Sequence, residues 1–261
     1  MSEDPILYRV TGEIATLVLN RPDKRNALDL AMWRLIPSLL DRAEADAHVK
    51  IVIIRGGDSR AFAAGADIAE FVRKNTSGPA IDAFYETVKT AMARVEACPK
   101  PTIAAIGGLC IGGGCGLALS CDIRFAAADA RLGITPAKLG LVYSVPDTRR
   151  LVAVVGPSRA RDMLFTGRLL DAEAAARAGL VDFVVPVDEF DARLGDYAAE
   201  ICANSQYSVR GIKEIVGLVE RGAQDDTPHS LNLLTGAFSG EDYREGTAAF
   251  LEKRRAIFPF R

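Results

Sequence analysis

Short, wholly apolar runs recur along the chain, and helical patterns lie between them. "VKIVIIRGG" and "KPTIAAIGG" are two such runs, each closed by a glycine pair. Runs of this kind are typical of strands that are buried on both faces of a parallel sheet, because an exposed face would bring alternating polar residues. Their alternation with helices predicts an α/β core up to Pro186. Residues from about 188 to 258 are helical in pattern throughout, which predicts a separate layer or a small subdomain.

The pattern also predicts individual elements. "ILYRVTGEIATLVLNRP" predicts two strands joined at Thr11–Gly12. Periodic apolar positions from Leu28 to Leu40 predict one helix, and a second long helix is expected over about 78–97. "AFAAGADIAEF" (61–71) predicts a loop that enters a short helix. Two further helices are expected at "PSRARDMLFTG" and "DAEAAARAG", and a last strand is expected at "VDFVVPVD".

Composition limits the class of protein. The 261 residues contain 32 Lys and Arg against 34 Asp and Glu, so no global field would recruit nucleic acid or a membrane surface. No run reaches the roughly 18 apolar residues that a transmembrane helix needs, and the acidic start lacks the apolar segment of a secretory signal. The five cysteines form no Cys-x-x-Cys pair and only two histidines are present. We therefore expect reduced thiols, no metal site and a cytoplasmic location.

The most unusual stretch is "CIGGGCGLALSCD" (110–122), where three glycines precede a helix-like run. Glycine disfavours a helix by roughly 0.5–1 kcal/mol relative to alanine, so glycines here indicate that something approaches the backbone closely. A strand that ends in glycines and enters a helix directs free N–H groups into open space, where they can bind an anion or a developing oxyanion. The stretch fits neither nucleotide-binding glycine motif, and Gly114 stands where a nucleophile elbow needs its nucleophile.

An oxyanion hole needs a second donor. "AFAAGAD" (61–67) is the best source, because it is a small-residue loop that follows a strand and contains a glycine. Each of the two glycine stretches could instead be a tight packing turn between a strand and a helix.

Together the two stretches resemble the signatures of the crotonase, or enoyl-CoA hydratase/isomerase, superfamily. The resemblance extends to "LNRPDKRNAL", "FTGRLLDAEAAARAGLVDFVV" and "EDYREGTAAFLEKRRAIF", and so covers nearly the whole chain. It implies a crotonase-like ββα superhelix over residues 1–195 and a C-terminal helical oligomerisation region over 196–261. It also implies an acyl-CoA substrate, no separate cofactor because coenzyme A is part of that substrate, and a homotrimer or hexamer (a dimer of trimers).

The resemblance implies roles for particular residues. By motif match, the backbone N–H groups of Ala66 and Gly113 hold the thioester carbonyl oxygen, on which an enolate places negative charge. The basic residues among the implied CoA contacts could instead be solvated surface charge. The implied CoA contacts are Lys24, Arg25, Ala64, Asp67, Ile68, Phe250 and Lys253, the last two from the same chain or from a neighbouring subunit.

The chain departs from the hydratase pattern at two positions. Hydratases of this family carry two glutamates that add water, and the resemblance places them at Gly116 and Pro136. No Asp or Glu occurs between Asp129 and Asp147, so the paired carboxylates needed for water addition are missing from their usual places. Ser144 stands where some isomerases and dehalogenases of the family carry an aspartate.

The segment "GITPAKLGLVYSVPDTRRL" (133–151) resembles methylmalonyl-CoA decarboxylase, a member that also lacks the glutamate pair. This resemblance implies that Thr135 and Tyr143 face the acyl group, as hydrogen-bond partners of a carboxylate or as a proton source. Decarboxylation suits the missing bases, because departing carbon dioxide leaves the enolate without proton abstraction. That enzyme carries a histidine where this chain has Ala66.

Other interpretations stay open. Asp147 could be a relocated acid/base, or it could cap the helix that begins near "TRRLVAVVG". Tyr143 could be a core aromatic, and Cys115 is a small buried thiol rather than a nucleophile, because no histidine lies nearby in sequence. The leading hypothesis is a decarboxylase-like acyl-CoA lyase. The alternatives are a hydratase or isomerase that uses Asp147 or a water, and a non-catalytic acyl-CoA-binding protein.

Overall fold

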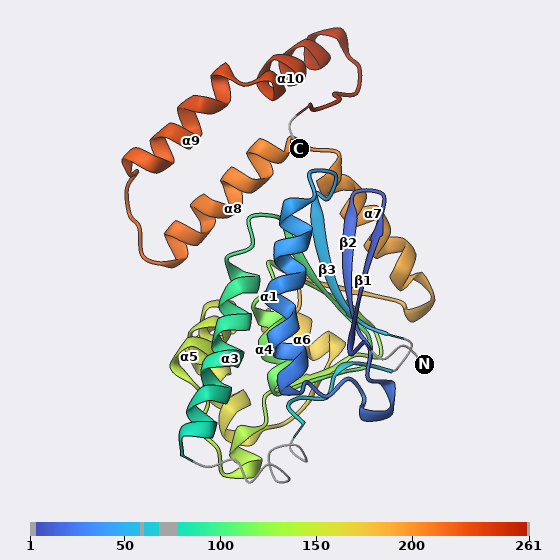
Figure 1. The fold of residues 1–261 in the computed structure, drawn as a ribbon, viewed down its shortest axis with the longest axis vertical. Helices are drawn as coiled ribbons and strands as arrows, with labels where there is room; N and C mark the ends of the chain where they lie inside the picture. The colour runs from blue at the N-terminus through green and yellow to red at the C-terminus, as the bar shows by residue number, and fades with distance from the viewer. Residues whose placement is uncertain (1–3, 58–59, 68–77, 260–261) are drawn as a thin grey trace.

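The structure, a computed structural model, describes residues 4–57, 60–67 and 78–259. Ile68, one of the implied CoA contacts, lies outside the described residues. The chain forms two sheets with helices around them, and a helical C-terminal arm extends beyond the sheets (Figure 1).

The larger sheet has six strands, in the order β1-β2-β3-β5-β7-β10. The first two form the expected antiparallel hairpin, and the other four run parallel to β2. Alternate residues of β3 enter different buried clusters, Ile51 and Ile53 on one face and Val52 and Ile54 on the other. Burial on both faces explains why these strands are wholly apolar. The strands are β1 (Ile6–Thr11), β2 (Ile14–Leu19), β3 (Ile51–Gly56), β5 (Thr102–Ile106), β7 (Ile123–Ala127) and β10 (Phe183–Val185).

The smaller sheet consists of β4 (Ala61–Ala63), β6 (Leu109–Ile111), β8 (Arg131–Gly133) and β9 (Leu170–Asp171), in that order. The pairs β3/β4, β5/β6 and β7/β8 each place one strand in each sheet, and an α-helix follows each pair. This repeat is the ββα superhelix that the family resemblance implies. One expectation was wrong in detail, because residues 61–63 form a strand on β6 where a loop was expected.

Helices cover both faces of the larger sheet. The first two long helices pack against each other, and Trp33 and Met92 from them enter the core. On the opposite face, α7 buries Phe190, Leu194 and Ala198. A non-helical residue, Gly156, interrupts α5, so a second helical segment precedes the one expected from Pro157. The helices here are α1 (Leu30–Ala45), α3 (Pro79–Glu96), α4 (Gly113–Leu119), α5 (Val145–Thr166), α6 (Ala172–Ala178) and α7 (Phe190–Cys202), with short 3-10 turns η1 (Pro22–Lys24), η2 (Pro136–Leu139) and η3 (Val187–Glu189).

The C-terminal arm comprises α8 (Gln206–Glu220), α9 (Pro228–Ser239) and α10 (Glu241–Glu252), drawn in orange to red in Figure 1. Gln206 is the only buried residue of α8, although this helix carries apolar side chains along one face. The proposed division at residues 195 and 196 stays a prediction, and α7 runs through it as one continuous helix. Among the described helices, none is long and apolar enough to cross a membrane.

Candidate active site

The loop after β4 presents the backbone of Ala66. Leu28 N donates to Gly65 O at 2.8 Å and Asp67 N donates to Leu28 O at 3.1 Å, so Leu28 and Ala66 form an isolated parallel bridge. In a parallel bridge of this kind the N–H of the central residue points away from the neighbouring segment. The Ala66 N–H therefore faces away from Leu28, and it has no backbone acceptor within the described part of the chain.

The glycine run meets this loop directly. Gly112 has a φ of 53°, a conformation that glycine adopts without strain, and Gly113 is the first residue of α4. A Cβ atom on Gly113 would lie 3.7 Å from Ala66 N, and one on Gly112 would lie 3.8 Å from Gly65 Cα. The amides of Ala66 and Gly113 thus lie in the same small region. Like that of Ala66, the Gly113 N–H finds no backbone acceptor among residues 4–57, 60–67 and 78–259.

A partly buried ion pair holds the Ala66 loop. Arg21 Nη2 donates to Asp67 Oδ2 at 2.9 Å, and Arg21 Nη1 donates to Ala27 O at 2.6 Å. Asn26 extends the contact, since its Oδ1 accepts from Arg21 N and its Nδ2 donates to Ala61 O at 2.8 Å. Asp67 is only 6% exposed, so its carboxylate serves this internal contact, and its contact with CoA stays a prediction. Sequence reasoning missed Arg21 and Asn26, although both lie in the quoted stretch "LNRPDKRNAL".

Two of the implied CoA contacts, Lys24 and Arg25, lie beside this loop. Lys24 and Arg25 are exposed, and Ala64 N donates to Arg25 O at 3.0 Å. The structure therefore brings 24–25 and 64–67 together, as a CoA site requires. Phe250 and Lys253 are elsewhere in the chain, at the end of α10, which Figure 1 shows well separated from α4.

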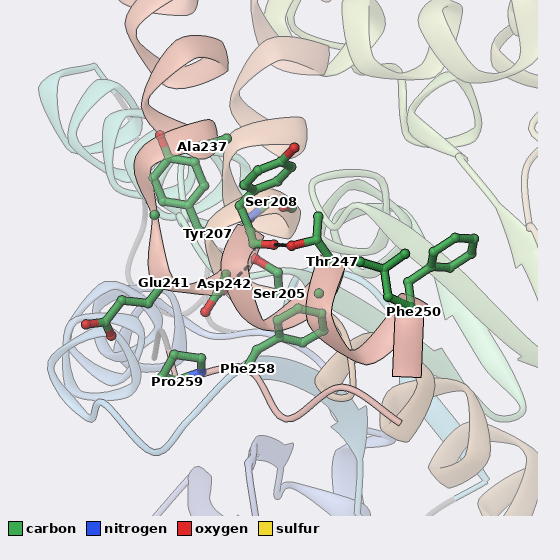
Figure 2. Close-up of a pocket in the computed structure, with 14 residues that line it drawn as sticks. Ser205, Tyr207, Ser208, Ala237, Glu241, Asp242, Thr247, Phe250, Phe258 and Pro259 are labelled. Carbon is green, nitrogen blue, oxygen red and sulfur yellow. Dashed lines mark hydrogen bonds between the residues drawn. The ribbon is translucent and has the colours of Figure 1, made fainter. Parts of the chain in front are cut away.

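A cavity of about 870 Å³ lies in the C-terminal arm, between α8, α9 and α10. Figure 2 shows Phe250 and Phe258 at this cavity together with the hydrogen bond from Ser205 to Asp242. The cavity contains none of the residues around the glycine run, so it is not the place where the two amides meet. It lies among helices whose apolar side chains are largely exposed in a single chain.

Tyr143 occupies the side-chain space of Gly116. A Cβ on Gly116 would lie 3.1 Å from Tyr143 Oη and 2.7 Å from Met92 Cε. This is one of the two positions where the resemblance places a hydratase glutamate. The Tyr143 hydroxyl is fully buried and has no hydrogen-bond partner in the described structure. Burial, reinforced by the nearby Asp147 charge, raises the pKa of Tyr143 well above its usual value, so the phenol stays protonated and can donate.

Asp147 is committed to contacts around the start of α5. Ser144 Oγ donates to Asp147 Oδ2 at 2.5 Å, and Arg150 Nη1 donates to Asp147 Oδ1 at 3.1 Å. The N-cap of α5 is Ser144, whose hydroxyl accepts from Asp147 N, so the cap interpretation of Asp147 was wrong. Arg150, 5% exposed at its side chain, also binds Glu96 at 2.8 Å. Burial alone would raise the pKa of Glu96, but hydrogen bonds and charge from the two arginines hold that pKa below its usual value.

Thr135 and Cys115 are the remaining residues that the sequence analysis considers. Thr135 precedes η2, is partly buried and makes no capping hydrogen bond through its side chain, so its contact with an acyl group stays a prediction. Cys115 is 1% exposed, and all five cysteines are free and buried. The arrangement around α4 therefore combines backbone N–H groups with a protonated phenol, and Asp147, whose charge acts on that phenol, is already ion-paired with Arg150.

Residues 9–260 match the family model of enoyl-CoA hydratase/isomerase. The chain belongs to this family. The crotonyl-CoA hydratase of Syntrophomonas wolfei is 34% identical to this crotonase-family chain over 262 residues, which cover 99% of each protein. An enoyl-CoA hydratase/isomerase family protein from Hyphomonas neptunium has a TM-score of 0.95 at 44% identity, with 98% of both chains covered. The enoyl-CoA hydratase of Bacillus anthracis has a TM-score of 0.89 at 33% identity, covering 99% of this chain and 100% of its own.

Proposed function

We propose that this crotonase-family enzyme removes carbon dioxide from a carboxylated acyl-CoA and holds the resulting enolate at the Ala66 and Gly113 amides. The observation that carries the proposal is the Tyr143 hydroxyl, which is buried, protonated and unpartnered in the described structure, over Gly116. A buried donor without a partner is uncommon and suggests a ligand group that accepts from it. A substrate carboxylate or an enolate is such an acceptor.

The proposed reaction needs no protein base. The bond between Cα and the carboxylate carbon breaks, its electron pair forms the enolate, and carbon dioxide leaves. Negative charge then rests on the thioester oxygen, where two preset amides stabilise it. Removing one donor of this kind typically costs about 2.7–4 kcal/mol of transition-state stabilisation. A proton from Tyr143 or from water completes the product at Cα.

A hydratase is the second candidate, because relatives at 34% identity are named crotonyl-CoA hydratase and short-chain-enoyl-CoA hydratase. In this chain Gly116 and Pro136 replace the glutamates of the hydratase pattern. The remaining acid/base candidate, Asp147, already accepts hydrogen bonds from Ser144 and Arg150. These contacts favour decarboxylation over hydration through Asp147.

The experiment is a substrate screen by mass spectrometry with malonyl-, methylmalonyl- and crotonyl-CoA. We expect the wild type to release carbon dioxide from a malonyl-type thioester and Gly113→Pro to lose this turnover, because proline removes the donor N–H yet is tolerated at the first position of a helix. Thermal unfolding of the wild type and of Gly113→Pro checks that the lost turnover is not a loss of the fold. Hydration of crotonyl-CoA that falls in Asp147→Asn would instead establish the hydratase. Binding without product from any thioester would support a non-catalytic acyl-CoA-binding protein.

We further propose that the active assembly is a homotrimer or a hexamer of two trimers. The exposed apolar side chains of the arm support this, including Ile212, Val216 and Val219 along α8. In such an assembly Phe250 and Lys253 of a neighbouring copy would close over the CoA nucleotide, which would explain their distance from α4 within one chain.

A further inference from the structure

Trp33 is a buried side chain whose polar atom makes no hydrogen bond within the described part of the fold. It lies in the first turn of α1 and is 1% exposed. Its indole Nε1–H has no hydrogen-bond partner among the described residues. Buried tryptophan N–H groups usually find an acceptor, because burial without one is costly. The apolar requirements of this core position would be met by an aromatic ring without a donor.

The position of the ring points to the acceptor. Trp33 Cζ2 lies 3.4 Å from the point where a Gly113 Cβ would stand, and Ala66 N lies 3.7 Å from the same point. Cζ2 and Nε1 are both bonded to Cε2, so the N–H belongs to the side of the indole that is near Gly113. Three donors without a described acceptor, namely the two amides and the indole, therefore lie close to one small region.

We infer that the indole N–H of Trp33 is a third hydrogen-bond donor to the thioester oxygen of the acyl-CoA substrate. The inference rests on the proposed oxyanion site, and it holds whether the subsequent reaction is decarboxylation or hydration. A site that consists only of hydrogen-bond donors suits an oxygen that gains negative charge, because such an oxygen accepts several hydrogen bonds and donates none. Trp33 thereby joins the groups that bind substrate, and α1 becomes part of the active site.

The direct test uses the fact that Trp33 is the only tryptophan of the chain. The full-length protein labelled with ¹⁵N therefore has one indole Nε1–H resonance, which can be followed during titration with acetyl-CoA. The matched ligand is S-ethyl-CoA, a thioether that keeps the nucleotide and pantetheine but has no carbonyl oxygen. We expect the indole proton to move downfield with acetyl-CoA and to stay nearly unchanged with S-ethyl-CoA, while calorimetry reports binding of both.

The outcomes separate this inference from the proposed function. Binding of both ligands without an indole response, or with the same response to each, overturns the role of Trp33 and leaves the two-amide site untouched. Failure of both ligands to bind overturns acyl-CoA recognition itself, and the inference falls with it.

Variants supply a second readout. Trp33→Phe removes the N–H and should lower kcat by about ten- to a hundredfold with little change in KM, because the bond strengthens as the oxygen gains charge. If Trp33→Phe folds poorly, replacement of the indole by a benzothiophene ring keeps the shape of the side chain without the N–H and should show the same loss. Tyr8→Phe is the matched control, since it removes another buried, unpartnered donor of the described structure, under Arg42. Full activity of the benzothiophene variant would overturn the inference.

Discussion

At the scale of one residue, we propose that Tyr143 serves catalysis at a cost to the stability of the fold. Its hydroxyl is buried without a partner in the described structure, so removing the oxygen relieves an unsatisfied donor. Tyr143→Phe should therefore leave the melting temperature unchanged or higher. The same variant should slow turnover of the carboxylated thioester by roughly 10- to 100-fold, since a hydrogen bond to a charged group contributes about 1.5–3 kcal/mol. Steady-state kinetics and thermal unfolding check the two halves, and a lowered melting temperature would show that the hydroxyl has a structural partner.

Asp67, in contrast, is a residue whose charge stabilises the fold around Ala66. Asp67→Asn removes one of the two carboxylates that the partly buried Arg21 guanidinium contacts, the other being Asp29 at 3.3 Å, and we expect the free energy of unfolding to fall by about 1–2 kcal/mol. Urea unfolding measures this loss. The matched control is Arg193→Gln, which removes an exposed ion pair with Glu189 and should change stability by less than about 0.5 kcal/mol. Equal losses in the two variants would contradict the positioning role of Asp67.

Helix α4 is the element that decides how much room the site has. Gly116→Ala places a methyl group 2.7 Å from Met92 Cε and 3.1 Å from Tyr143 Oη, so one of them must move. We expect a loss of about 1–2 kcal/mol and lower turnover. Gly195→Ala in α7 meets nothing within 4 Å and should stabilise the protein by about 0.5–1 kcal/mol.

A double-mutant cycle tests the cause of the Gly116 effect. In a Met92→Ala background the added methyl group has space, so the loss in free energy of unfolding caused by Gly116→Ala should largely disappear. Chemical unfolding measures this loss in both backgrounds. A penalty that is unchanged in this background would place the conflict at Tyr143 or in the backbone of α4.

Among the elements, those defined by a continuous pattern were predicted well. β3 and β5 are recognisable because burial on both faces requires apolar side chains at every position, and α1 follows a regular helical period. β4 was missed, because its three residues become a strand only through pairing with β6, which is distant in sequence. Pairing of this kind depends on tertiary contacts, not on local propensity.

At the scale of the whole molecule, the arm from α8 to α10 is the surface that we propose to mediate assembly. Ile212, Val216 and Val219 are 61%, 52% and 61% exposed and share one face of α8, because they follow the i, i+4, i+7 spacing. We expect the wild type to be a trimer or hexamer in light scattering after size exclusion, and Ile212→Asp combined with Val216→Asp to yield folded monomers. Glu220→Gln, an exposed polar change on the same helix, should keep the assembly. A monomeric wild type would contradict the proposed assembly.

The sequence by itself determined the family, the buried strands and the two glycine stretches, because apolar runs and glycines are local signals that survive without coordinates. By resemblance it also placed Gly116 and Pro136 at the two positions where hydratases carry glutamates, and that assignment stays a prediction. Only the tertiary structure decided which side chains surround those stretches. Trp33 lies against Gly113 and Arg21 reaches Asp67, 46 residues away in the chain, and no periodicity relates such pairs. Their contacts arise when the two sheets and α1 pack together, because packing in three dimensions joins residues that no local pattern connects.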